Sequence, residues 1–166
     1  MRVLVVSDTH APSRWRGTPA GLADALASGP DLILHAGDVC RPEVLNGLSQ
    51  WAPVRAVLGN NDGPELRRWG ATPWFEETLD GLAVAMIHDS GDRTGRAGRM
   101  RRRFPDASLV IYGHSHIPWD AYDEPTGLHL FNPGSPTDPR RQPFGTFGWL
   151  TIEDGRLVAS EIVRAD

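Results

Sequence analysis

The hydrophobic positions in the first half of this sequence fall into three short, almost continuous runs, over residues 2–7, 31–35 and 54–58. More polar segments with helical signals separate these runs. Strands that are apolar along their whole length are typical of parallel sheets, because both faces of such sheets are covered. The alternation of strand and helix therefore predicts an α/β fold in which helices cover a parallel sheet.

Three segments carry the helical signals. The first covers residues 18–28, with Thr18 as the expected N-cap and proline at the first helical position. A second, shorter helix opens at Arg41 and the proline that follows it. The third candidate covers residues 92–104 and ends before a proline.

The second half contains more strand-like runs and fewer helical signals. Asp154 and Gly155 separate the last two runs, and this dipeptide is typical of a tight hairpin. A mixed sheet or a second sheet is therefore expected, within a single domain over residues 1–166. The runs of the second half are 82–87, 109–112, 128–131, 146–152 and 157–163.

Polar residues that can bind metal follow five of the apolar runs. In open α/β sheets, functional groups gather beyond the carboxyl ends of the strands. Residues two apart in extended chain point to the same side, so Asp8 can converge with His10, and His114 with His116. The five segments are Asp8-Thr9-His10, Gly37-Asp38, Gly59-Asn60-Asn61-Asp62, His88-Asp89 and Gly113-His114-Ser115-His116.

The chemistry of these side chains indicates a metal centre. Oxygen and imidazole donors without sulfur suit manganese, iron, zinc or cobalt. The candidates are too many for one zinc ion and match two ions that share a carboxylate, an arrangement used to hydrolyse phosphate esters. Glycines at 37, 59 and 113 are expected to let the backbone leave the sheet sharply. The candidate ligands are Asp8, His10, Asp38, Asn60, His88, His114 and His116.

Composition narrows the possible chemistry. All 17 basic residues are arginine, so a Walker A loop, a Schiff base and a lysine general base are excluded. The one cysteine, Cys40, excludes a disulfide framework, an iron–sulfur cluster and a thiolate zinc site, and is consistent with a reducing cytoplasm. A net charge of −4 argues against bulk nucleic-acid binding, and no apolar run is long enough to span a membrane.

Taken in order, the five motifs resemble those of the calcineurin-like metallophosphoesterases. The resemblance extends from Val3 to about Thr151 and is closest to the small single-domain bacterial and archaeal phosphodiesterases. Residues 132–135 and 139–141 are also similar to that branch. The resemblance implies a four-layer αββα sandwich of two mixed β-sheets flanked by helices.

The resemblance also implies an activity and a division of the ligands. A hydroxide bridging two divalent ions would attack the phosphorus of a small phosphate ester, as a phosphodiesterase or a phosphatase does. Manganese is the first expectation, with iron, zinc, cobalt or nickel as alternatives, and a homodimer or tetramer is plausible. One ion would be held by Asp8, His10 and His116, the other by Asn60, His88 and His114, and Asp38 would bridge them.

The sequence departs from the family pattern at two positions. Many members have a histidine after the motif asparagine that is proposed to protonate the leaving group, whereas this chain has Asn61, which cannot act as a general acid. Asp62 is expected to orient its neighbours, so both residues are weak catalytic candidates. Asp89 replaces a common glycine and is expected either to crowd the site or to add an acceptor near the ligands.

Simpler interpretations remain for several residues. Residues 60–63 alone could be a turn. His35 and His129 match no ligand position and are expected to be structural, and Cys40 is expected to be a buried, unreactive thiol. The arginines at 99 and 101–103 are expected to form a solvated helix face, with a nucleic-acid patch as the alternative. 

Some interpretations concern function. Arg140 and Arg141 could clamp a phosphate or be solvated loop residues, and most of the six tryptophans are assigned to packing. Besides the enzyme, two functions stay open. One is a protein-binding scaffold, as in the retromer subunit that is similar to this family, and the other is a small nuclease.

Overall fold

The computed structural model describes residues 1–166, which form two five-stranded β-sheets with helices outside them. The first sheet has the strand order β10-β9-β1-β2-β3. Strands β1, β2 and β3 are parallel, whereas β9 runs antiparallel to β1 and β10 antiparallel to β9. Its strands are β1 (Arg2–Val6), β2 (Leu32–His35), β3 (Val54–Ala56), β9 (Thr146–Glu153) and β10 (Arg156–Arg164).

The second sheet has the order β4-β5-β6-β8-β7. Its three inner strands β5, β6 and β8 are parallel, and the edge strands β4 and β7 are antiparallel to their neighbours. Both sheets are therefore mixed. The strands are β4 (Trp74–Leu79), β5 (Leu82–Ile87), β6 (Leu109–Ile111), β7 (Trp119–Asp123) and β8 (Leu128–Asn132).

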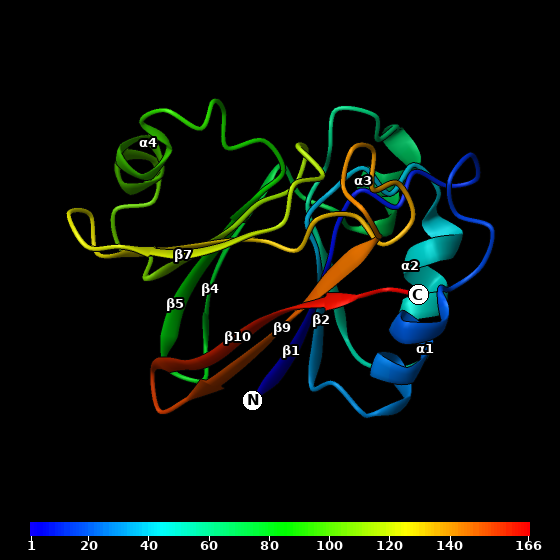
Figure 1. Ribbon diagram of the computed structural model, residues 1–166, viewed down its shortest axis with the longest axis horizontal. Helices are drawn as coiled ribbons and strands as arrows, with labels where there is room; N and C mark the ends of the chain where they lie inside the picture. Colours follow the sequence, from blue (N-terminus) through cyan, green and yellow to red (C-terminus); the bar gives the residue numbers. More distant parts are fainter.

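The two sheets pack face to face between two outer helical layers (Figure 1). One outer layer contains α1, α2 and α3, and α4 lies on the other side of the molecule. This arrangement confirms the predicted αββα sandwich. The helices are α1 (Ala20–Ala27), α2 (Pro42–Leu48), α3 (Pro64–Trp69) and α4 (Arg96–Arg103).

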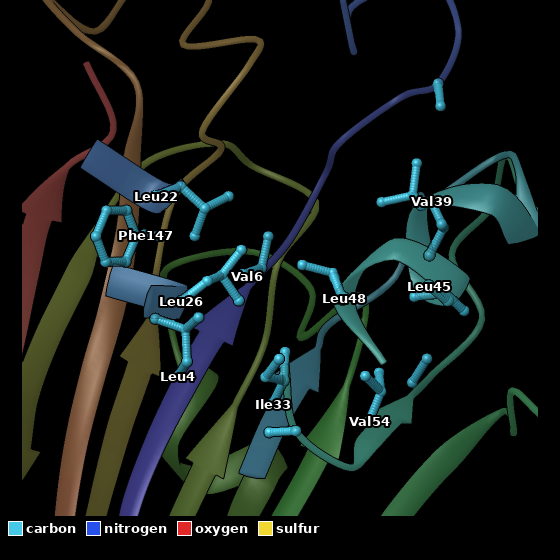
Figure 2. Close-up of a cluster of buried hydrophobic side chains, with 14 of the residues drawn as sticks. Leu4, Val6, Leu22, Leu26, Ile33, Val39, Leu45, Leu48, Val54 and Phe147 are labelled. Atoms are coloured by element: carbon cyan, nitrogen blue, oxygen red, sulfur yellow. The ribbon is translucent and has the colours of Figure 1, made fainter. Parts of the chain in front are cut away.

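Strand β1 shows why its sequence is apolar on both faces. Leu4 and Val6 belong to the core beneath α1 and α2, whose residues Leu22 and Leu45 pack there (Figure 2). The alternate residues, including Val5, belong to the core between the two sheets. Because successive side chains of a strand point to opposite faces, a central strand covered on both sides needs a continuous apolar run.

Several sequence predictions need correction. The first helix begins at Ala20, its N-cap is Pro19, and no side chain caps it, so the expected cap by Thr18 is wrong. The third predicted helix begins four residues later than expected, at Arg96. The late hairpin forms as expected but joins the first sheet beside β1. No helix of the structure has the length and hydrophobicity needed to cross a bilayer.

Three elements were not anticipated: β4, β7 and α3. The two strands lie at the edges of the second sheet and expose much of their surface, with burial alternating weakly along polar sequences. Helix α3 has only six residues, too few to show a helical repeat in the sequence.

Candidate metal centre

The five predicted motifs meet at one end of the sheets, beyond the carboxyl ends of β1, β2, β3, β5 and β6. Backbone hydrogen bonds join the loops. The N–H of Asp8 donates to the carbonyl of Gly37 at 2.9 Å, and the N–H of His10 donates to the carbonyl of Asp38 at 3.0 Å. In the second sheet, the N–H of Gly113 donates to the carbonyl of His88 at 2.9 Å. Backbone hydrogen bonds alone therefore hold these loops next to one another.

Two groups of three side chains face each other within this cluster of loops. Within each group, one candidate ligand atom per residue lies within 4.8 Å of the others. The first group comes from the ends of β1 and β6, and the second from the ends of β2, β5 and β6. The first group is Asp8, His10 and His116, and the second is Asp38, His88 and His114.

Asp38 lies between the two groups, whereas Asn60 contacts only the second. The Oδ2 atom of Asp38 lies 3.7 Å from Nε2 of His10 in the first group and 3.5 Å from Nε2 of His88 in the second. The Oδ1 atom of Asn60 lies 3.1 Å from Nε2 of His88 and 3.0 Å from Nδ1 of His114. All seven predicted ligands are therefore in one place, with Asp38 between the groups.

Hydrogen bonds on the far side of two imidazoles orient them toward the cluster. Nδ1 of His88 donates to the carbonyl of Ala36 at 2.7 Å, and Nδ1 of His116 donates to the carbonyl of Asp138 at 2.6 Å. A carbonyl can only accept, so the proton of each neutral ring is on Nδ1. The lone pair on Nε2 then faces the carboxylates, which is the usual arrangement behind a metal-binding histidine.

A buried carboxylate oxygen in the first group has no hydrogen-bond partner. Asp8 is fully buried, and its Oδ1 atom is unsatisfied although Nε2 of His116 lies 3.3 Å away. Its Oδ2 atom accepts from the hydroxyl of Ser7 at 2.6 Å and from the N–H of His114 at 3.1 Å. Buried polar atoms without a partner are rare and costly, and a cation at this point would satisfy both Oδ1 and the neighbouring nitrogen.

The titration of the cluster follows from burial and from the two carboxylates. Burial lowers the pKa of His88, but the hydrogen bond to Asp38 and the nearby negative charges outweigh it and raise the pKa above 6.5. The pKa of His116 is raised in the same way, where Asp8 opposes the effect of burial. Burial dominates at His10 and lowers its pKa. The carboxylates thus attract positive charge to this point.

The pKa of Asp38 is lowered below its ordinary value. Burial acts to raise this pKa, but His88, in its protonated form, and two hydrogen bonds from Asn61 outweigh burial. A carboxylate that stays ionised in a buried position is a suitable ligand for a cation.

Asp62 fixes the loop positions of the second group. Its Oδ2 atom accepts from the N–H groups of Asp38 at 2.9 Å and Gly59 at 2.7 Å, and its Oδ1 atom accepts from the N–H of Cys40 at 2.7 Å. One side chain therefore holds the loop after β2 against the loop after β3. The expectation that Asp62 orients its neighbours agrees with this geometry.

Three glycines allow the close approach of the loops. A Cβ atom on Gly59 would lie 2.1 Å from Oδ1 of Asp38, and one on Gly113 would lie 2.0 Å from Oγ of Ser7. Gly37 has a φ of +94°, and its Cβ would lie 2.7 Å from Nδ1 of a candidate ligand. At 59 and 113 the reason for glycine is space and not a sharp turn, which corrects the sequence interpretation.

The cluster also concentrates unusual backbone geometry. Non-glycine residues adopt positive φ only rarely, at a cost of order 1–2 kcal/mol each. Such strain persists where the surrounding structure holds it, and it gathers at functional sites. Five of the seven candidate ligands have φ values between +47° and +66°: Asp8, His10, Asp38, His114 and His116.

A loop after β8 supports the first group, and its role was not anticipated. The hydroxyl of Ser135 donates to the carbonyl of Asp8 at 2.7 Å, and the hydroxyl of Thr137 donates to the carbonyl of Thr9 at 2.9 Å. Asn132 donates to the carbonyl of Gly113 at 3.0 Å. The only sequence signal for this loop was its similarity to the family, because its contacts to the site run largely through backbone carbonyls.

His35 and His129 lie where the simpler interpretations placed them, whereas Cys40 is only partly buried. His35 is fully buried and its Nε2 atom lies 3.1 Å from Oγ1 of Thr9. His129 pairs with Asp120 away from the cluster at 2.5 Å. Burial raises the pKa of the Cys40 thiol to about 12, which keeps it unreactive, although its Sγ atom is 3.8 Å from Nδ1 of His10.

The arginines and Asp89 differ in how far they agree with the sequence expectations. Arg99 and Arg101 donate to backbone carbonyls and are not simply solvated, which corrects the expectation for the helix face. The guanidinium of Arg140 is 4.0 Å from the carboxylate of Asp138. Asp89 lies 4.0 Å from Nε2 of His114, on the side of the ring away from Asn60, which is too far for a hydrogen bond.

Comparisons with known proteins agree with this geometry. The calcineurin-like phosphoesterase superfamily domain matches residues 1–155. A protein of Methanothermobacter thermautotrophicus named "Probable metallophosphoesterase" is 38% identical, and the match covers 99% of this chain and 92% of that protein. A protein of Methanocaldococcus jannaschii with the same description is 34% identical over 93% of this chain and 77% of its own length.

A solved structure shows the same fold. The crystal structure of Vps29 from Entamoeba histolytica complexed with Zn²⁺ superposes with a TM-score of 0.80. The two chains are 25% identical, and the match covers both completely.

Proposed function

The chain belongs to the calcineurin-like phosphoesterase superfamily, and we propose that it is a two-metal-dependent phosphoesterase acting on a small phosphate ester. The observation that carries this proposal is the position of Asp38. Its Oδ2 atom lies 3.7 Å from a nitrogen of one candidate group and 3.5 Å from a nitrogen of the other. A carboxylate between two sets of ligands is what a pair of metal ions needs.

The residues present fit two divalent cations. Asp8, fully buried with one unsatisfied oxygen, and the lone pairs of His88 and His116 face the same cluster of loops. Each cation would have nitrogen and oxygen donors and no sulfur, which suits manganese first and also iron, zinc, cobalt or nickel. The zinc complex of the structurally similar Vps29 supports a divalent ion here.

Bound divalent cations would supply a nucleophile at neutral pH, by lowering the pKa of water, and would neutralise charge on the phosphoryl oxygens. The chain's own residues hold the ligands in place. Asp62 and Asn61 fix Asp38, and the carbonyls of Ala36 and Asp138 fix the rings of two histidines. By formal count, two divalent cations and two carboxylates leave the cleft at about +2, which attracts an anionic ester despite the net charge of −4.

The test is hydrolysis of bis-p-nitrophenyl phosphate with added manganese. We expect metal-dependent turnover by the wild type and a loss of at least about 100-fold in Asp38→Asn, because even residues behind metal ligands contribute 10–100-fold. Asp106→Asn, an exposed carboxylate remote from both groups, is the matched control and should keep full activity. No turnover in the wild type, or undiminished turnover in Asp38→Asn, would contradict the proposal. p-Nitrophenyl phosphate in parallel separates diester from monoester preference.

The structural similarity to Vps29 supports one alternative, a protein-binding scaffold built on the same fold. The complete set of candidate ligands favours the enzyme. Purification without metal or activity, together with a stable protein partner, would favour the scaffold. A cytoplasmic location and a dimeric or tetrameric state stay predictions, and a small nuclease stays an alternative function.

A further inference from the structure

A shallow cavity of about 330 Å³, wide open to solvent, lies beside the second candidate group. Asn60 and His88, both candidate ligands, line it, and so do Asp89 and Arg67. Apolar side chains from the ends of β3 and β5 complete its walls. Its volume is enough for a ring-sized group, since ligand pockets begin at roughly 300 Å³. Because Asn60 and His88 belong to both, the cavity is continuous with the proposed metal centre.

Arg67 is the one cation among the residues that line this cavity. Its guanidinium is exposed, in the last turn of α3, and makes no hydrogen bond or ion pair within the chain. This differs from Arg96 and Arg101, whose guanidinium groups donate to protein oxygens. A planar guanidinium that stays charged at any working pH matches the oxygens of phosphate esters.

The position of Arg67 in the last turn has a simpler explanation, because cations near a helix C-terminus are favoured by the helix dipole. Arg68 shares that advantage, with the same helix and the same turn. Only Arg67 lines the cavity. The helix dipole explains why a basic residue is favoured in this turn. It does not explain why Arg67, and not Arg68, lines the cavity.

The residue after the motif asparagine, Asn61, cannot protonate a leaving group near this cavity. The amide of Asn61 is engaged with Oδ2 of Asp38 at 2.7 Å and carries no acidic proton. Arg67 cannot donate a proton readily either, but its charge can stabilise an oxyanion. Arg67 can therefore assist departure of the leaving group by stabilising its negative charge.

We propose that Arg67 binds the leaving-group oxygen of the substrate in this cavity and stabilises the negative charge that develops there; this inference rests on the proposed phosphoesterase function. In the reaction, water releases a proton to solvent and its oxygen forms a new bond to phosphorus, while the bond from phosphorus to the leaving oxygen breaks. The leaving oxygen keeps the electron pair, next to Arg67, and then takes a proton from solvent. The substrate class is a phosphoester of a ring-sized alcohol or phenol.

The experiment compares Arg67→Gln and Arg68→Gln on diaryl phosphates whose phenols differ in acidity, from p-nitrophenol to phenol. We expect Arg67→Gln to lose about 10-fold in kcat/KM with the p-nitrophenyl ester and about 100-fold or more with the phenyl ester, as for removal of one charge-stabilising donor. The dependence of rate on leaving-group pKa becomes steeper in this variant. Added guanidinium ion should restore part of the rate, and Arg68→Gln should stay within about twofold of the wild type.

The outcomes separate the two proposals. A wild type without metal-dependent turnover overturns both. An active wild type with an unchanged leaving-group dependence in Arg67→Gln overturns only the role of Arg67, whether the rates fall uniformly or not at all. Both side chains are exposed on the same helix turn, so we expect the melting temperatures of both variants to equal that of the wild type, which excludes a folding defect.

Discussion

Asn61 donates two hydrogen bonds to Asp38. Its backbone N–H donates to Oδ1 at 2.8 Å, and its side-chain amide donates to Oδ2 at 2.7 Å. Asn61, which follows the motif asparagine, thus helps to hold the Asp38 carboxylate in place between the two groups. Where a histidine at this position could act as an acid, the asparagine here holds a candidate ligand, Asp38.

Substitution of Asn61 tests this role. In Asn61→Ala the backbone bond remains and the side-chain bond is lost, so we expect manganese affinity to weaken by about 10-fold, in the range for residues behind metal ligands. Titration calorimetry measures the affinity. Gln50→Ala, an exposed residue at the end of α2, is the control. Equal affinity in Asn61→Ala and the wild type would show that the hydrogen bond does not position Asp38.

Metal binding should weaken as the pH falls. The pKa values of His88 and His116 lie above 6.5, so both rings take up protons readily once the pH drops below neutral, and a protonated ring cannot bind a cation. We expect the apparent manganese affinity to fall between pH 7.5 and 5.5, by about tenfold per pH unit for each histidine that must lose a proton. Activity should disappear in parallel. Activity that persists at pH 4 would contradict histidine ligation.

His35 should make the stability of the fold sensitive to acid. Burial lowers its pKa from 6.5 to about 4. The unfolded chain then binds a proton between these values while the folded chain does not, so stability is complete above pH 6.5 and declines as the pH falls toward 4. The decline attributable to His35 is about 3 kcal/mol.

Chemical denaturation with a chelator present measures this decline. His35→Gln, which can still donate to Thr9, should show a shallower loss of stability between pH 6.5 and 4. The same slope in the variant and the wild type would assign the acid sensitivity to other groups.

Two glycines should respond in opposite directions to alanine. A Cβ on Gly113 would lie 2.0 Å from Oγ of Ser7 and 2.7 Å from Oδ2 of Asp8, so we expect Gly113→Ala to destabilise the protein by about 2 kcal/mol and to lower metal affinity. A Cβ on Gly47, inside α2, meets nothing within 4 Å. Gly47→Ala should therefore stabilise the protein by up to about 1 kcal/mol. Thermal unfolding of both variants measures these changes in stability. Equal changes in melting temperature for the two variants would contradict the close approach at Gly113.

The sequence identified most central strands and all seven candidate ligands. Strand β1 was recognisable because a strand covered on both faces must be apolar throughout, and the ligands because each followed such a strand. The edge strands β4 and β7 were missed, since a strand with one neighbour and exposed faces can have a polar sequence.

The sequence by itself determined which side chains can bind metal and at which strand ends they stand. The tertiary structure decided how they divide into two groups, with Asp38 between them. It also decided which carbonyls orient the imidazoles, Ala36 for His88 and Asp138 for His116. The physical reason is that every residue carries a carbonyl, so only the packing of distant loops selects the ones that accept a hydrogen bond. The cavity beside Arg67 likewise exists only because α3 packs next to the ends of two sheets.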